Sequence, residues 1–73
     1  MENNSKIFGI RTVIEAINSG TTIDKVFLQK GLHGELFQEL ESLLRKQAIN
    51  SSYVPVEKLN RLSDKNHQGV VAQ

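Results

Sequence analysis

The sequence predicts a small α/β domain, a three-layer α/β/α sandwich around a mostly parallel sheet. Two observations predict this class. Strand-length apolar runs alternate along the 73 residues with stretches of helical periodicity. The runs at residues 26–28 (VFL) and 70–72 (VVA) are unbroken, as in strands that are covered on both faces. The resulting order, β-α-β-α-β-α-β, indicates right-handed crossovers with helices on both sides of the sheet.

The first helix is predicted inside "TVIEAINSG", which follows the short apolar run "KIFGI" and its Gly9. The aliphatic residues of this stretch fall on one side of a helix. Thr12 and Glu15 have the spacing of a capping box, which places the helix start at Thr12, and Gly20 suits a left-handed stop. A strand is expected next, in "DKVFLQK".

The second half of the chain repeats the alternation. Residues 35–46 carry an i, i+4, i+7, i+8 apolar stripe, typical of an amphipathic helix, with Glu35 in the first turn and basic residues in the last. A short strand around residues 53–54 ends at Pro55, which lacks the ladder donor. Leu59 and Leu62 then have helical spacing, and "SDKNHQG" is expected to be a loop before the last strand.

Length and composition indicate one domain: a polar, disordered tail at residues 1–6 and a folded unit at residues 7–73. The chain has no cysteine and two histidines, so neither disulfides nor a closed zinc site are expected to support the core. The N-terminus lacks the apolar run of a signal peptide, and no stretch approaches the roughly 20 apolar residues of a membrane span. We expect a cytoplasmic protein without a membrane partner. The net charge of +1 offers no global attraction for nucleic acid.

No constellation of nucleophile, base and metal ligands is visible, so no catalytic, cofactor-binding or metal-binding residues are predicted. The loop "KGLHGE" places Gly31 and Gly34 between a strand and a helix, but it lacks the Walker spacing and its Gly-Lys-Ser/Thr ending. A structural turn is the favoured interpretation, with His33 exposed in it. The carboxylates of the following helix are interpreted as a solvated face; these are Glu35, Glu39 and Glu41.

The basic residues are more informative by position than by number. Arg11 follows the first strand and Lys30 the second, and ligands of open α/β sheets bind outside the carboxyl ends of strands. Further basic residues come from the third helix and the loop after it: Lys58, Arg61 and Lys65. A basic edge of this kind suits contacts to RNA phosphates. The alternative, from the residues alone, is an ordinary solvated surface.

The stretch "NHQG" directly before the last strand is open to two interpretations. Asn66 and Gly69 are turn formers, so a polar turn explains it without function. Asn66, His67 and Gln68 are also rich in donors and acceptors, which could contact bases or 2′-hydroxyl groups. The missing Cβ of Gly69 permits close approach of a ligand or of another backbone segment.

Taken together, "IFGIRTVIEAI", "DKVFLQK", the pair Leu59 and Leu62, and the ending "NHQGVVA" resemble the N-terminal substrate-binding domain of the SpoU/TrmH family of RNA ribose 2′-O-methyltransferases. The resemblance covers nearly the whole chain after Lys6. "HQGVVA" is its most specific part, and residues 9–16 match the family's opening Gly-x-x-x-Val-x-Glu-Ala pattern.

The resemblance implies a fold similar to that of kink-turn-binding ribosomal proteins, used to hold RNA. It also implies that S-adenosylmethionine and the catalytic residues belong to a separate C-terminal knotted domain, so that this chain alone is non-catalytic. Ribosomal RNA is the favoured partner, with transfer RNA as the alternative. The parent enzyme is expected to dimerise through the knotted domain, and this chain to be monomeric. The residues expected to bind RNA are Arg11, Lys30, Lys58, Arg61, Lys65, Asn66, His67 and Gln68.

Two other classes remain open at this point. A stand-alone kink-turn-binding protein of the ribosomal type would use the same fold without a catalytic partner. A protein–protein adaptor would dock onto the knotted domain or onto ribosomal proteins. Charge reversal at Arg11, Lys30 and Arg61 should weaken RNA association if the domain is the RNA-binding module of a methyltransferase and leave it intact if the domain is an adaptor.

Overall fold

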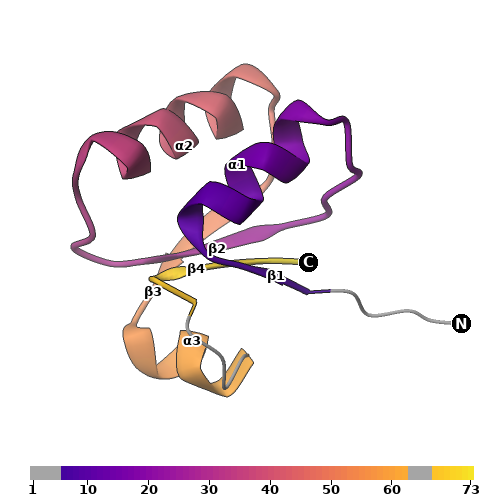
Figure 1. The fold of residues 1–73 in the computed structure, drawn as a ribbon. Coiled ribbons are helices and arrows are strands. Elements are labelled where there is room, and N and C mark those ends of the chain that lie inside the picture. Colours follow the sequence, from indigo (N-terminus) through magenta and orange to yellow (C-terminus); the bar gives the residue numbers. More distant parts are fainter. Residues whose placement is uncertain (1–5, 63–66) are drawn as a thin grey trace, which may run out of the picture.

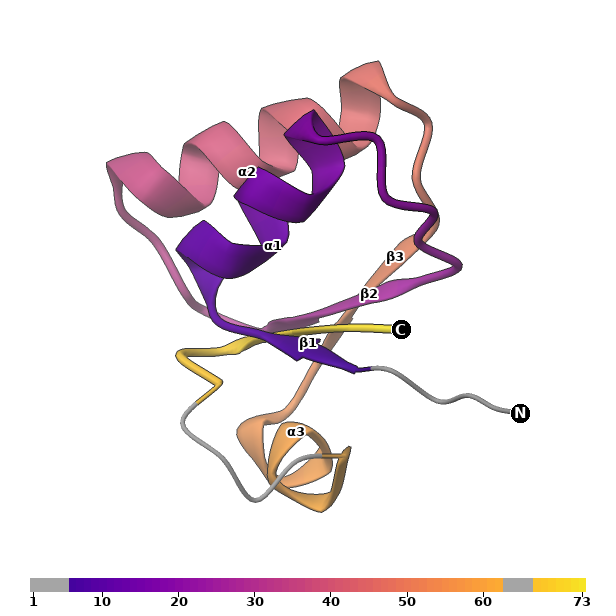
Figure 2. The same cartoon turned by 45° about the vertical axis from the view of Figure 1, so that its right-hand side comes forward.

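The computed structural model describes residues 6–62 and 67–73. Four strands and three helices follow one another in the predicted order, which confirms the α/β class. Their bounds are β1 (Ile7–Phe8), α1 (Ile10–Asn18), β2 (Val26–Gln29), α2 (Glu35–Lys46), β3 (Ser51–Val54), α3 (Val56–Leu62) and β4 (Val70–Ala72). Helices α1 and α2 cover one face of the sheet and α3 covers the other, as Figures 1 and 2 show.

The prediction of a mostly parallel sheet is wrong. The strand order is β1-β4-β2-β3, and only β2 and β3 pair in parallel. Strand β4 lies between β1 and β2 and runs antiparallel to both. Strands β1, β2 and β3 therefore point in one direction, and β4 points in the other.

The direction of β4 follows from the path of the chain before it. Strand β3 ends at the same edge of the sheet at which β4 begins, because Lys30 N–H donates to Val54 O, and Gln29 N–H donates to Gly69 O. Between these points α3 has only seven residues, a length of about 10 Å. The chain thus returns to the edge that it left, and β4 enters the sheet from there.

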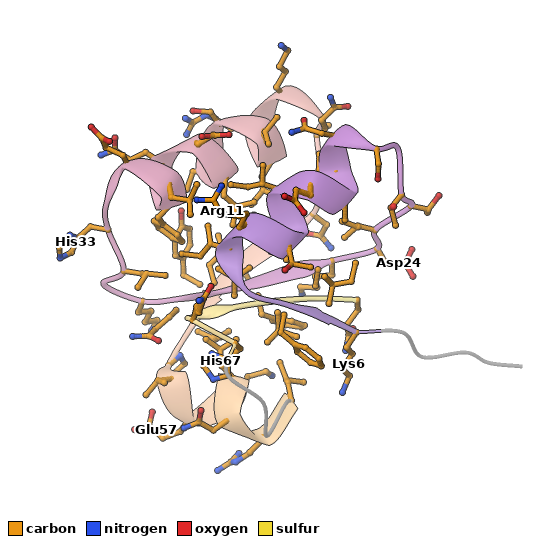
Figure 3. The ribbon with its side chains drawn as sticks, viewed as in Figure 1. Lys6, Arg11, Asp24, His33, Glu57 and His67 are labelled. Carbon is orange, nitrogen blue, oxygen red and sulfur yellow. The ribbon has the colours of Figure 1, made fainter. Side chains whose placement is uncertain are left out.

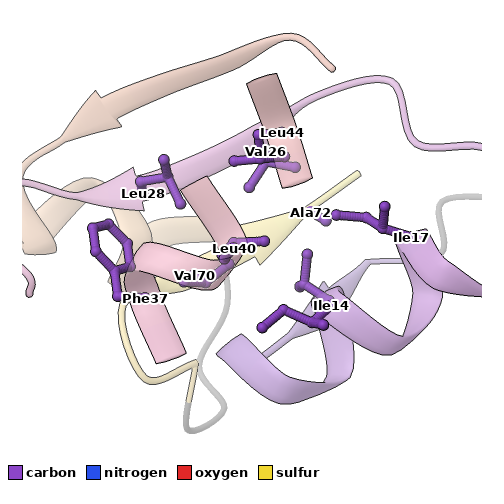
Figure 4. Close-up of a cluster of buried hydrophobic side chains, with 10 residues drawn as sticks. Ile14, Ile17, Val26, Leu28, Phe37, Leu40, Leu44, Val70 and Ala72 are labelled. Carbon is purple, nitrogen blue, oxygen red and sulfur yellow. The ribbon is translucent and has the colours of Figure 1, made fainter. Parts of the chain in front are cut away.

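The core forms two clusters, one on each face of the sheet, because side chains alternate along the two central strands. Val26, Leu28, Val70 and Ala72 face α1 and α2, whose aliphatic and aromatic residues complete the larger cluster (Figure 4). Phe27, Val71, Val54 and Leu59 form the smaller cluster under α3. The unbroken apolar runs are therefore explained by burial on both faces, as predicted.

The end of helix α1 was predicted correctly, whereas its start was not. Helix α1 begins at Ile10, two residues before Thr12, so the predicted capping box does not form. Gly20 does end this helix: its N–H donates to Ile17 O, and Thr21 N–H donates to Ala16 O, which is the Schellman pattern. None of these helices, over the ranges given above, is long and apolar enough to cross a membrane.

Candidate functional site

The carboxyl ends of β1, β2 and β3 and the amino end of β4 lie at the same end of the sheet. We call this end the carboxyl edge; the name refers to the strand ends and not to the outer strands β1 and β3. Had β4 been parallel, the residues before it would lie at the opposite edge, far from Arg11 and Lys30. In Figure 3, Arg11, His33 and His67 lie toward one side of the molecule, whereas Lys6 and Asp24 lie toward the other. The antiparallel strand therefore brings His67, Gln68 and Gly69 to the ends of the first two strands.

The turn that leads into β4 uses backbone conformations that are rare outside glycine. Val70 N–H donates to His67 O at 2.9 Å, and the two residues between them, Gln68 (φ 55°) and Gly69 (φ 86°), both have positive φ. Two consecutive positive φ angles are typical of a type I′ turn. A glutamine in this region is unusual, and strain of this kind costs of order 1 kcal/mol.

Gln68 compensates for part of that cost at the start of α1. Its Oε1 accepts a hydrogen bond of 3.3 Å from Ile10 N–H, the first residue of the helix. Gly9, at the N-cap, has no side chain that could do this. A residue 58 positions away thus supplies the cap that the sequence pattern had assigned to Thr12.

His67 is 8% exposed, and both of its ring nitrogens have partners within the chain. Nδ1 accepts from Gly69 N–H at 2.9 Å. In the neutral ring the proton then lies on Nε2, which is 2.8 Å from Asn60 Oδ1 on α3. These contacts tie the turn to α3 and give His67 a structural part, while its contact to RNA stays a prediction.

Gly69 confirms the expectation of a close backbone approach. A Cβ at this position would lie 2.7 Å from Leu32 Cδ2 and 3.2 Å from Gln29 Cβ. The neighbour is part of the chain itself, because Gln29 N–H donates to Gly69 O at 2.9 Å. Glycine is required here for β4 to lie against the end of β2.

The predicted basic residues divide into two groups. Arg11, in the first turn of α1, and Lys30, directly after β2, are exposed at the carboxyl edge beside the exposed Gln68. Lys58 and Arg61 are exposed on α3, which covers the opposite face of the sheet. Lys65 and Asn66 lie outside the described residues.

Two lysines share one aromatic ring, which the sequence pattern did not indicate. The ammonium groups of Lys25 and Lys58 lie 5.2 Å and 5.7 Å from the ring centroid of Phe27, close enough for cation–π attraction. Lys25 was not among the predicted site residues. A lysine from before β2 and one from α3 thus each lie near the ring of Phe27, which belongs to the smaller core cluster.

A second unpredicted group lies between α2 and the edge strand β3. The hydroxyl of Tyr53 donates a hydrogen bond to Glu41 Oε2, so this carboxylate is not simply solvated. That hydrogen bond, partial burial and the charge of Glu41 raise the pKa of Tyr53 above its usual value, against the lowering effect of Arg45. Together with Leu28, Leu44, Ile49 and Ser51, these residues line a pocket of about 230 Å³.

In residues 6–62 and 67–73, no group of three or more metal-ligating side chains comes together. The pocket beside β3, at about 230 Å³, lies below the roughly 300–1,000 Å³ of sites that enclose drug-sized ligands. What the carboxyl edge offers is two cations and an amide, which suits contact with a polyanion.

We predict that His67→Ala and Gln68→Gly differ in their effect on stability. Loss of the imidazole leaves the buried Gly69 N–H without its acceptor, which costs about 1–3 kcal/mol. Gln68→Gly loses one exposed hydrogen bond but relieves the positive φ, so its effect should stay within about 0.5 kcal/mol. Urea unfolding followed by circular dichroism measures both; equal losses would contradict the structural part assigned to His67.

We also predict that Gly69→Ala is more destabilising than Gly31→Ala. Both glycines have a similar positive φ, +86° and +82°, so the backbone strain of an alanine is matched. The added Cβ meets Leu32 and Gln29 at position 69 but nothing within 4 Å at position 31. The same unfolding experiment should show a larger loss for Gly69→Ala, by about 1 kcal/mol or more; a larger loss at Gly31 would contradict the packing of β4 described above.

Comparison with known proteins identifies the family. The family model described as RNA 2′-O ribose methyltransferase substrate binding matches residues 6–73. Proteins named "Putative TrmH family tRNA/rRNA methyltransferase" from Staphylococcus haemolyticus and Staphylococcus saprophyticus are 36% and 39% identical over 66 residues, 90% of this chain and 26% of each relative. The similarly named YacO of Bacillus subtilis is 32% identical over 72 residues, 99% of this chain and 29% of its own length. The chain thus spans little more than a quarter of these relatives. The resemblance found in the sequence is confirmed, and the chain belongs to the family of RNA 2′-O ribose methyltransferase substrate-binding domains.

Proposed function

We propose that this domain holds RNA at its carboxyl edge, so that a ribose 2′-hydroxyl can be methylated by another part of a longer enzyme. The observation that carries the proposal is that the turn with Gln68 is hydrogen-bonded to Ile10, next to Arg11, and to Gln29, next to Lys30. These residues come from α1, from the end of β2 and from the turn before β4, and the antiparallel direction of β4 brings them together.

Arg11 and Lys30 supply the electrostatic part of the interaction. With a net charge of +1, the chain has no general attraction for RNA, so a local pair of exposed cations has to provide it. Contacts of this kind fix the position of the RNA backbone without reading its sequence. We propose Lys58 and Arg61 as further phosphate contacts along α3, while Lys65 and Asn66 stay predictions.

Gln68 supplies a polar contact from the turn before β4. It is exposed, its Oε1 faces the start of α1, and its amide can donate outward to a phosphate or a 2′-hydroxyl. A strained non-glycine residue in an exposed turn suggests selection for its side chain. His67, which ties this turn to Asn60, supports Gln68 from within.

The rest of the enzyme supplies the chemistry in this proposal. The substrate hydroxyl is methylated from S-adenosylmethionine on a separate C-terminal domain. We propose that the parent enzyme is a cytoplasmic homodimer joined through that domain. Its favoured substrate is ribosomal RNA, with transfer RNA as the second choice.

The experiment is RNA binding by charge-neutralised variants, measured as the slope of log affinity against log salt concentration. The probes are fluorescent bulk transfer RNA and transcribed segments of large-subunit ribosomal RNA. Arg11→Gln with Lys30→Gln removes two phosphate contacts, which should make the negative slope shallower by about 1.4–1.8. The matched control, Lys6→Gln with Lys46→Gln, removes the same charge from residues away from the carboxyl edge and should leave the slope unchanged.

Circular dichroism and urea unfolding verify that both double variants remain folded. An equal loss in the two pairs would mean that only net charge matters, which contradicts a site at the carboxyl edge. Absence of salt-dependent binding to either RNA by the unmodified chain would overturn the proposal altogether.

A further inference from the structure

The pocket beside β3 combines groups that no part of the proposed function uses. Its floor is Leu28, which is 1% exposed, and its walls come from the second half of α2 and from the edge strand. Tyr53, half exposed, lies at its mouth together with Glu41 and Arg45. One aromatic ring, one carboxylate and one guanidinium thus surround a small apolar floor.

The fold positions these groups for reasons that are visible in the backbone. Ser51 and Tyr53 point to the same face of the sheet, because side chains alternate along β3 and Val54 packs under α3. Strand β3 is the last of the sheet, so its outer side has no neighbouring strand among the described residues. Glu41 and Arg45 are four residues apart on α2 and therefore share the side of the helix that overlooks Tyr53.

We propose that this pocket binds one unstacked guanine base of the RNA that the carboxyl edge holds. The proposal rests on the proposed function and extends it, from backbone contact at one edge to base recognition at a second place. The base lies against Tyr53, and Glu41 accepts hydrogen bonds from its Watson–Crick edge.

The chemistry of the pocket favours guanine over the other bases. The Watson–Crick edge of guanine carries two adjacent donors, N1–H and N2–H, and a carboxylate is an acceptor only. Tyr53 occupies one of the roughly four acceptor positions of Glu41, so the carboxylate retains capacity for such a pair. Adenine, cytosine and uracil lack two adjacent donors on that edge.

The size and the surroundings of the pocket fit a single base of unpaired RNA. About 230 Å³ is several times the roughly 30 Å³ of one water but falls below the volume of a typical cofactor site. Bases in single-stranded RNA are recognised by stacking on aromatic or guanidinium planes, and Tyr53 and Arg45 offer one of each. Lys30 N–H donates to Val54 O, so the backbone of Lys30 lies one residue beyond Tyr53 along β3.

Nuclear magnetic resonance of Tyr53 tests the proposal directly, because the chain has one tyrosine and no tryptophan. The unmodified chain is titrated with each of the four ribonucleoside monophosphates. We expect GMP to shift the Tyr53 ring signals in a saturable way, with at least about fivefold tighter binding than AMP, CMP or UMP. Equal shifts with all four nucleotides, or none with GMP, would overturn the proposal.

Glu41→Gln is the diagnostic variant, because it keeps the shape of the side chain and replaces one acceptor with a donor. It should abolish the preference for GMP. The control is Glu39→Gln, an exposed carboxylate on the same helix that does not line the pocket, and it should keep the preference. Loss of preference in both variants, or in neither, would overturn the assignment to Glu41.

The outcome is independent of the test of the proposed function. If salt-dependent RNA binding through Arg11 and Lys30 is observed but GMP leaves Tyr53 unchanged, only the guanine pocket fails. A dilution series without nucleotide completes the design: Tyr53 signals that shift with protein concentration would indicate that a second copy covers the pocket, which would overturn base binding there.

Discussion

The insertion of β4 between β1 and β2, antiparallel to both, is the constraint on which the rest of the structure depends. Two backbone hydrogen bonds hold the start of this strand: Gly9 N–H donates to Val70 O, and Gln29 N–H donates to Gly69 O. Both involve a glycine with positive φ, and at Gly69 a Cβ would collide with the side chain of Leu32 and crowd Gln29 at the end of β2. The same contacts that close the sheet therefore place the preceding turn beside Arg11 and Lys30.

The elements themselves could be predicted from sequence, because their signals are local. The apolar stripe of α2, the Schellman stop at Gly20 and the unbroken runs of β2 and β4 all depend on neighbouring residues. The direction of β4 could not be predicted, because a strand that is buried on both faces has the same apolar pattern either way. The alternating order of strands and helices indicated crossovers, and hence a parallel strand.

The candidate site could be predicted only in part, for a related reason. Arg11 and Lys30 were found because their position after a strand is a local feature. The bond between Gln68 and Ile10 joins residues 58 positions apart, and the tie from His67 to Asn60 depends on where α3 lies. The pair Tyr53 and Glu41 likewise requires knowledge of which face of β3 meets α2. The partner of each of these side chains could therefore not be read from the sequence.

The polar turn before β4 thus serves the fold and the proposed RNA contact together. Its buried half, His67 and Gly69, secures the strand, and its exposed half, Gln68, caps a helix and faces outward. This division separates residues whose loss should unfold the domain from residues whose loss should weaken binding. It also explains why "NHQG" fits both a structural turn and a site.

The central claim is that RNA is held at the edge where β4 enters the sheet, and mapping of backbone amide signals tests it most directly. An isotope-labelled chain is titrated with bulk transfer RNA while its amide resonances are followed. The account predicts the largest shifts at Ile10, Arg11, Lys30 and Gln68, with little change at Asp24 and Gln73 at the opposite edge. Shifts concentrated at that opposite edge, with the carboxyl edge unaffected, would contradict it.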